Sequence, residues 1–142
     1  MKRILSAGLL MTVVIGSAYA HHSFAQYYFE ERSVTIEGEL VKFEYRSPHA
    51  WVHVDVRDER GATRQYAAEW ANPNRLTRDD ITQDTLKIGD RVVITGSPGR
   101  NPEEYKLHLK RIQRPSDGWS WPGSRGQRNA LSPRERTARR AG

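Results

Sequence analysis

Apolar and polar residues alternate along most of the middle of the chain, and a period of two predicts β-strands. Within Ser33–Tyr45 the alternation changes phase just after Gly38, which predicts a long strand with a bulge or sharp bend. Residues Trp51–Arg57 alternate without a break, and the polar residues 58–61 form a turn signal before a return segment over Thr63–Trp70. These two segments therefore predict a β-hairpin.

One short helix is expected between the third and fourth strands. Asn72 is a suitable N-cap and Pro73 is favoured at the first helical position, so the helix is expected to run from Pro73 to about Asp80. Two more alternating segments, Arg91–Gly96 and Tyr105–Gln113, predict the last two strands. Seven aliphatic residues of the strands are expected to be buried: Leu40, Val52, Val54, Val92, Ile94, Leu107 and Leu109.

The order β-β-β-α-β-β, with a bent first strand, is typical of the OB-type barrel, a five-stranded Greek-key fold. We therefore predict a mainly β fold: a five-stranded OB-like barrel with one short helix between strands 3 and 4. A lipocalin-like barrel or a sandwich fragment is the alternative architecture.

The two ends of the chain differ in composition from the middle. Residues 1–20 contain a basic start, an apolar run and an A-x-A site, the pattern of a secretory signal peptide. The apolar run is shorter than the about 20 residues that a membrane-spanning helix needs. We expect a signal peptide at 1–20, a barrel domain at 21–113 and a disordered Arg-rich tail at 114–142. The protein is expected in the periplasm or outside the cell, with no transmembrane segment in the mature chain.

The tail contains two tryptophans, Trp119 and Trp121, among Gly, Ser, Pro and Arg. One interpretation, which we favour, is that one of them docks on the barrel. The alternative is that they help the Arg-rich tail to touch an anionic membrane surface.

The net charge of +6 is distributed unevenly along the chain. Of the 23 Lys and Arg residues, two lie in residues 1–20 and seven in residues 114–142, which leaves 14 against 15 acidic residues in the barrel segment. A nucleic-acid binder usually carries its positive charge on a folded face, so nucleic acid is not the expected partner. The chain has no Cys, which excludes disulfides and thiolate metal ligands.

No catalytic motif is present in the sequence. It lacks the G-x-S-x-G elbow, a P-loop and a dinucleotide-binding glycine pattern. Nothing specifies a hydrolase or transferase, and the pattern favours a binding protein over an enzyme.

The predicted cleavage point gives the sequence its main candidate for chemistry. Cleavage after Ala20 would leave His21 as the first residue. A terminal His offers its α-amine and its ring Nδ1 to one metal ion in a six-membered chelate. Together with another imidazole these atoms form a three-nitrogen set, and copper prefers such tetragonal nitrogen ligation.

The remaining histidines are the candidates for the third nitrogen. His49 is the expected ligand, provided that a turn at the preceding proline folds it back, and His22 or His53 is the reserve. Glu69 is an axial or supporting carboxylate, although a surface salt bridge explains it equally. His108 lies between two lysines and is expected to be solvated. The alternative is that the terminal histidines are part of a flexible N-terminus and have no role in metal binding.

A second hypothesis needs no metal. OB barrels bind oligomers across strands 2 and 3, where Trp51, Tyr66 and Trp70 lie with Glu69 beside them. These residues predict a ligand-binding face of a non-catalytic OB module for a peptide, a glycan or another envelope partner.

Four short motifs resemble a family of small exported bacterial proteins classed as a domain of unknown function. They are an HHSFA mature start at His21–Ala25, an N-P-H-A-W-like segment at Ser47–Trp51, a P-N-x-L segment at Pro73–Leu76 and an L-K-x-G-D segment at Leu86–Asp90. Ser47 stands where the family usually has Asn. The resemblance covers residues 21–113, and it implies export and an OB-type barrel rather than an activity.

Overall fold

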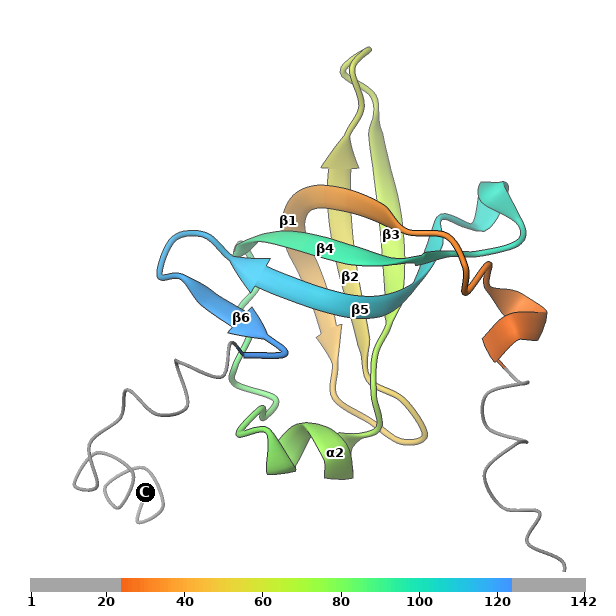
Figure 1. Cartoon of the computed structure of the whole chain (residues 1–142). Coiled ribbons are helices and arrows are strands. Elements are labelled where there is room, and N and C mark those ends of the chain that lie inside the picture. Colours follow the sequence, from red (N-terminus) through yellow and green to blue (C-terminus); the bar gives the residue numbers. More distant parts are fainter. Residues whose placement is uncertain (1–23, 124–142) are drawn as a thin grey trace, which may run out of the picture.

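The computed structural model describes residues 24–123 of the 142-residue chain. The predicted signal peptide, and residues 124–142 of the predicted tail, lie outside these residues. Five strands form a closed barrel (Figure 1): β1 (Val34–Glu44), β2 (Trp51–Arg57), β3 (Thr63–Glu69), β4 (Arg91–Pro98) and β5 (Lys106–Arg114). β1 pairs antiparallel with β2 and β4, and the parallel pairing of β3 with β5 closes the barrel. The predicted OB-like, mainly β fold is confirmed.

The first strand bends through both halves of the barrel, as its sequence pattern predicts. Its register with β2 shifts between Leu40 and Lys42, so the bulge lies a few residues after Gly38. Gly38 itself has a different role. A Cβ at this position would lie 2.5 Å from the carbonyl oxygen of Asp55, so only glycine permits the close approach of the two strands.

The barrel interior is filled by the side chains that alternate inward. All seven aliphatic residues predicted to be buried are at most 3% exposed. Trp70, which follows β3, is 1% exposed and meets the ring of Trp121 edge-on, at 5.2 Å between centroids. The core therefore extends beyond the strands of the barrel to a residue of the predicted tail.

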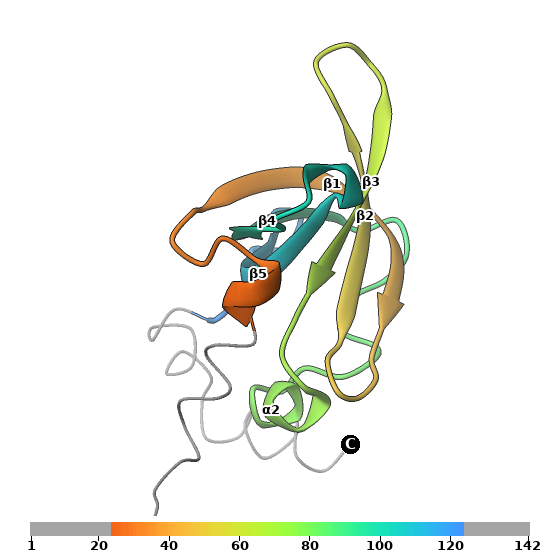
Figure 2. The same ribbon diagram turned by 90° about the vertical axis from the view of Figure 1, so that its right-hand side faces the viewer.

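The short helix α2 (Pro73–Arg78) lies below one end of the barrel, between β3 and β4 (Figure 2). The side chain of Asn72 caps it by accepting a hydrogen bond from the backbone nitrogen of Arg75, at 2.9 Å. Leu76 is fully buried and attaches the helix to the core. The helix ends two residues before the predicted end. None of the helices in the described part of the chain is long and apolar enough to cross a membrane.

A sixth strand, β6 (Trp119–Trp121), pairs antiparallel with β5 outside the closed barrel. Trp121 is 6% exposed, and its Nε1 donates to the Asp79 carboxylate at 2.8 Å. The docking expected for one of the two tryptophans is therefore observed. The folded part of the chain continues past the boundary expected at Gln113, because this tryptophan completes the core.

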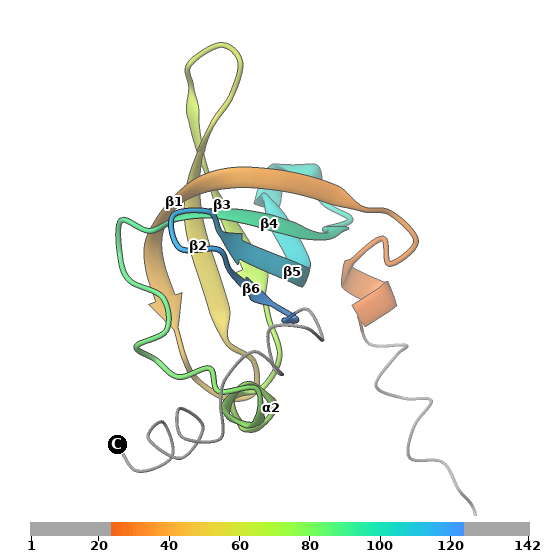
Figure 3. The same ribbon diagram turned by 60° about the vertical axis from the view of Figure 1, so that its left-hand side comes forward.

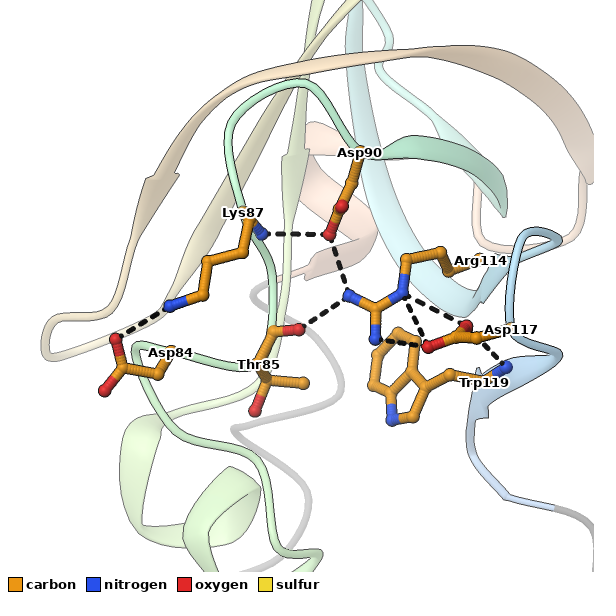
Figure 4. A network of polar contacts seen from close by, with 7 residues as sticks. All are labelled: Asp84, Thr85, Lys87, Asp90, Arg114, Asp117 and Trp119. Carbon is orange, nitrogen blue, oxygen red and sulfur yellow. Dashed lines mark hydrogen bonds and ion pairs between the residues drawn. The ribbon is translucent and has the colours of Figure 1, made fainter.

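Arg114 holds the turn that leads into β6 (Figure 4). Its guanidinium donates to the Thr85 carbonyl at 2.8 Å, to Asp90 at 2.7 Å and to Asp117 at 2.9 Å. The Trp119 ring packs against the same guanidinium, with 5.5 Å between Cζ and the ring centroid. This network connects the loop before β4 with the end of β5.

Candidate functional site

The first described residues pack against the outside of the barrel. Residues 24–27 form a helical turn next to β4 and β5 (Figures 1 and 3). A β-bridge between Tyr28 and Gly99, and a hydrogen bond of 2.9 Å from the Phe29 nitrogen to the Pro98 carbonyl, fix the chain that follows. The turn therefore holds a defined position over the strands.

Barrel closure brings together polar side chains from distant parts of the sequence. In the parallel pair of β3 and β5, Glu69 stands opposite His108, and both alternate with buried residues, so they point outward. Trp51, the first residue of β2, is the antiparallel partner of Glu69, and His49 lies two residues before it. His49, Glu69 and His108 thus lie on the same outer surface.

A carboxylate orients each of the two imidazoles. The Nδ1 atom of His49 is 2.6 Å from Oε1 of Glu69, and Nδ1 of His108 is 2.7 Å from Oε1 of Glu30. Because a carboxylate only accepts hydrogen bonds, Nδ1 of His49 carries the proton, and Nε2 of the neutral ring keeps its lone pair. Nδ1 of His108 has a second neighbour, Nζ of Lys110 at 2.8 Å, so it can donate to Glu30 or accept from Lys110. Proteins commonly orient metal-binding histidines with this type of carboxylate contact.

Two aromatic residues of the N-terminal segment join the imidazoles. The Tyr28 hydroxyl donates to Oε2 of Glu69 at 2.5 Å, and burial, followed by this hydrogen bond, raises the pKa of Tyr28. The Phe24 ring stacks on His108 with 4.0 Å between centroids and contacts His49 at 5.3 Å. We refer to the six residues as the histidine–glutamate cluster: Phe24, Tyr28, Glu30, His49, Glu69 and His108.

Burial favours the neutral form of His108. Burial lowers the pKa of His108, and this effect outweighs the opposing hydrogen bond to Glu30. Burial alone would raise the pKa of Glu30, but hydrogen bonds from Lys110 and His108 together lower it. Lys110 lies 2.6 Å from Oε2 of Glu30. His108 is therefore in the form that binds metal ions at neutral pH.

The structure changes the set of candidate histidines. His108, which was expected to be solvated, is only 17% exposed because the N-terminal segment covers it. His53, a reserve ligand in the sequence prediction, lies outside the cluster and hydrogen-bonds Glu44 at 2.8 Å. His21 and His22 lie outside the described residues, so the terminal chelate stays a prediction. Among residues 24–123, no group of three acidic or histidine side chains is arranged to hold a metal ion by itself.

The aromatic residues of the second hypothesis do not form one exposed face. Trp70 is 1% exposed and belongs to the core. Tyr66 pairs with the inward-pointing Val54, whereas Trp51 pairs with the outward-pointing Glu69. Register partners share a side of the sheet, so Trp51 and Tyr66 lie on opposite sides. This prediction is therefore corrected: the strand alternation separates the three aromatic residues.

Sequence reasoning did not identify Phe24, Tyr28, Glu30 and His108 as site residues. The alternation around His108 indicates that it points outward, and an OB barrel requires β3 to pair with β5. Only the register, which no local pattern specifies, reveals that His108 stands opposite Glu69. The HHSFA motif contains Phe24 and could have drawn attention to it.

The comparisons with known proteins concern the family and the fold. The sequence model of a family of unknown function, DUF6152, matches residues 9–108. No curated protein matches the chain. Two crystal forms of Rim1, the mitochondrial single-stranded DNA-binding protein of S. cerevisiae, are similar to the barrel. Form 2 gives a TM-score of 0.44 at 15% identity and Form 1 gives 0.46 at 14%; each match covers 58% of this chain and 91% of that chain. Neither match bears on what this chain binds.

Proposed function

The chain belongs to this family of unknown function, and we propose that it is an exported periplasmic protein that binds copper with its processed N-terminus. Its role would be to carry or buffer the metal. The proposal rests on one observation in particular: two imidazoles, each oriented by a carboxylate through Nδ1, meet the ring of Phe24. Phe24 lies only three residues after His21.

The short connection keeps the proposed terminal chelate within reach of the cluster. Three residues of fully extended chain span at most about 10 Å, so the His21 amine and Nδ1 are tethered close to Phe24. We propose that these two nitrogens and Nε2 of His49 bind the copper ion. Among the divalent metal ions of the first transition row, copper binds most tightly to a nitrogen site of this type. His108 replaces His53 as the reserve imidazole, and His22 stays a second reserve.

The other members of the cluster would support the metal without binding it. Glu69 fixes the ring of His49 and is itself held by the Tyr28 hydroxyl, so both bonds hold His49 in one orientation. Such supporting contacts raise the basicity of the ligand and reduce the ordering that metal binding requires. The burial of Trp70 leaves the competing hypothesis of a peptide, glycan or envelope partner without one of its three aromatic residues.

The decisive experiment is a titration with copper(II) of two proteins, one that begins at His21 and one with an additional alanine before it. The additional residue converts the amine into an amide, which is a poor ligand. Loss of a supporting residue lowers the metal affinity of such sites about 10–100-fold. We expect the additional alanine to lower the copper affinity by more than this. Affinity should also fall as pH is lowered, because protons compete with the metal ion for the amine and the imidazoles.

Two histidine variants of the processed protein identify the third nitrogen. His49→Ala should weaken copper binding and reduce the number of nitrogens seen by electron paramagnetic resonance. His53→Ala is the matched control, because it also removes an imidazole with a carboxylate partner from the same part of the chain. Equal copper affinity of the processed and the extended proteins would contradict the proposal.

A further inference from the structure

A pocket of about 590 Å³ lies outside the histidine–glutamate cluster, and none of its lining residues belongs to the cluster. Its walls come from the segment before β1, the start of β1, Tyr66 of β3 and the connection between β4 and β5. The volume falls within the range of about 300–1,000 Å³ that is usual for small-molecule sites. The pocket is therefore large enough for a ligand of one or two fused rings.

Aromatic rings form the apolar part of this pocket. Tyr66 and Tyr105 meet edge-on, with 5.2 Å between centroids and an angle of 71°, and Phe29 contributes a third ring. Tyr105 has a φ of 47°, in the left-handed region that few residues other than glycine adopt. Residues held in this conformation occur often at ligand-binding sites. The backbone at Tyr105 thus has an unfavourable conformation at the position where its ring lines the pocket.

The polar part of the pocket is positively charged. Its lining includes Arg32, Arg100 and Lys106 but no carboxylate. Lys106 forms an ion pair of 2.6 Å with Glu104, so its charge is matched. Within residues 24–123, Arg32 has only a distant ion pair, 3.9 Å from its sequence neighbour Glu31.

The two arginines are held at one ring. The guanidinium carbons of Arg32 and Arg100 lie 4.1 Å and 4.5 Å from the Phe29 centroid. The Nε atom of Arg100 donates to the Ala25 carbonyl at 2.8 Å, and no acidic side chain among the described residues pairs with Arg100. Both guanidinium groups thus line the pocket at the same ring, and neither is matched by a close acidic side chain among the described residues. Guanidinium groups of this kind bind negative groups through their N–H donors.

We propose that this pocket binds a planar aromatic ligand that carries one oxyanion group, a carboxylate or a phosphate ester. The rings of Tyr66 and Tyr105 provide the apolar wall for the aromatic body. The guanidinium groups of Arg32 and Arg100 bind the oxyanion, because their paired N–H donors match the geometry of both carboxylate and phosphate. The proposal is independent of copper binding, since it uses none of the residues of the histidine–glutamate cluster.

Calorimetric titration with four probes tests the ligand class. The probes are 2-naphthoate, 2-naphthyl phosphate, the neutral 2-naphthylmethanol and acetate. We expect at least one naphthyl anion to bind about tenfold or more tightly than the neutral alcohol, as for a hydrogen bond to a charged group, and we expect acetate not to bind. The anion that binds more tightly shows whether the pocket prefers a carboxylate or a phosphate ester. Equal binding of the anions and the alcohol, or no binding of either anion at millimolar concentration, would overturn the proposal.

Substitutions locate the binding event in the pocket. Arg32→Gln and Arg100→Gln should each weaken binding of the preferred anion several-fold, and Tyr66→Leu should weaken it as well. Arg91→Gln removes the same charge from an exposed arginine of β4 that does not line the pocket, so it should have no effect. Arg100 also holds the N-terminal turn, so Arg100→Gln can unfold that segment. In that case Arg32→Gln still tests the proposal. Equal losses in Arg91→Gln and Arg32→Gln would show that only general charge attraction is involved.

Discussion

Two histidines near the start of β2 have the same partner chemistry but different surroundings. His49 lies 2.6 Å from Glu69, and His53 lies 2.8 Å from Glu44. Glu69 accepts its other hydrogen bond from the neutral Tyr28 hydroxyl. Glu44, in contrast, is surrounded by charged groups on the outer surface of β1 and β2.

The cations around Glu44 account for this difference. Lys42 lies 3.0 Å and Arg46 lies 2.6 Å from its carboxylate oxygens. The hydrogen bond from Lys42, followed by those from Arg46 and His53, lowers the pKa of Glu44 to about 2. Its carboxylate is thus shared among three partners, which stabilises a surface ion cluster. A histidine–carboxylate pair becomes a candidate metal ligand only where other donors can reach the free ring nitrogen, and at His49 we propose that His21 supplies them.

The largest expected difference between the two pairs concerns copper. In the protein that begins at His21, Glu69→Gln should reduce copper affinity about 10–100-fold, because the amide no longer fixes the His49 ring as a carboxylate does. Glu44→Gln should leave the affinity unchanged. Both variants remove one carboxylate next to a histidine, so competition titrations with a copper chelator compare them directly. An equal loss in both variants would show that the two pairs are equivalent, contrary to our proposal.

The sequence was sufficient to predict the fold because the alternation of apolar residues is strong. On β2, the valines at alternate positions, among them Val52 and Val54, are separated by polar or aromatic residues. This alternation is enough to show which face of the strand is buried. The site was harder to predict, since its members meet through the pairing of distant strands. His108 has a local pattern typical of a solvated residue, but the parallel register with β3 places it next to Glu69.

Residues after the last barrel strand show a second limit of sequence analysis. Trp121 lies in a segment rich in Gly, Ser and Pro, and its composition predicts disorder. A three-residue strand and one buried ring are enough to attach this segment to the core. Such a short element has no periodicity that a sequence window could detect.

A smaller difference is expected in stability. Tyr28→Phe removes the hydroxyl that donates to Glu69 but keeps the buried ring. The expected cost is about 1.5–3 kcal/mol, the usual net value of a hydrogen bond to a charged group. Lys42→Met, which removes an exposed cation from Glu44, should change the free energy of unfolding by less than about 1 kcal/mol. Urea denaturation at neutral pH measures both changes. A larger loss of unfolding free energy in Lys42→Met than in Tyr28→Phe would show that the contact with Glu44 is the stronger of the two.

The smallest expected effect is a change in the acid stability of the Glu44 cluster. The folded-state pKa of Glu44 is about 2, below the ordinary value of 4.5. The unfolded chain therefore binds a proton first as pH falls, and the stabilisation present above pH 4.5 is lost between about 4.5 and 2. Glu44→Gln should be less stable than the parent at pH 7, and the difference should shrink at pH 3. Glu39→Gln is the matched control, because it removes a carboxylate of the same strand that has no ion pair among the described residues. A constant difference for Glu44→Gln would show that the surrounding cations do not stabilise the ionised carboxylate.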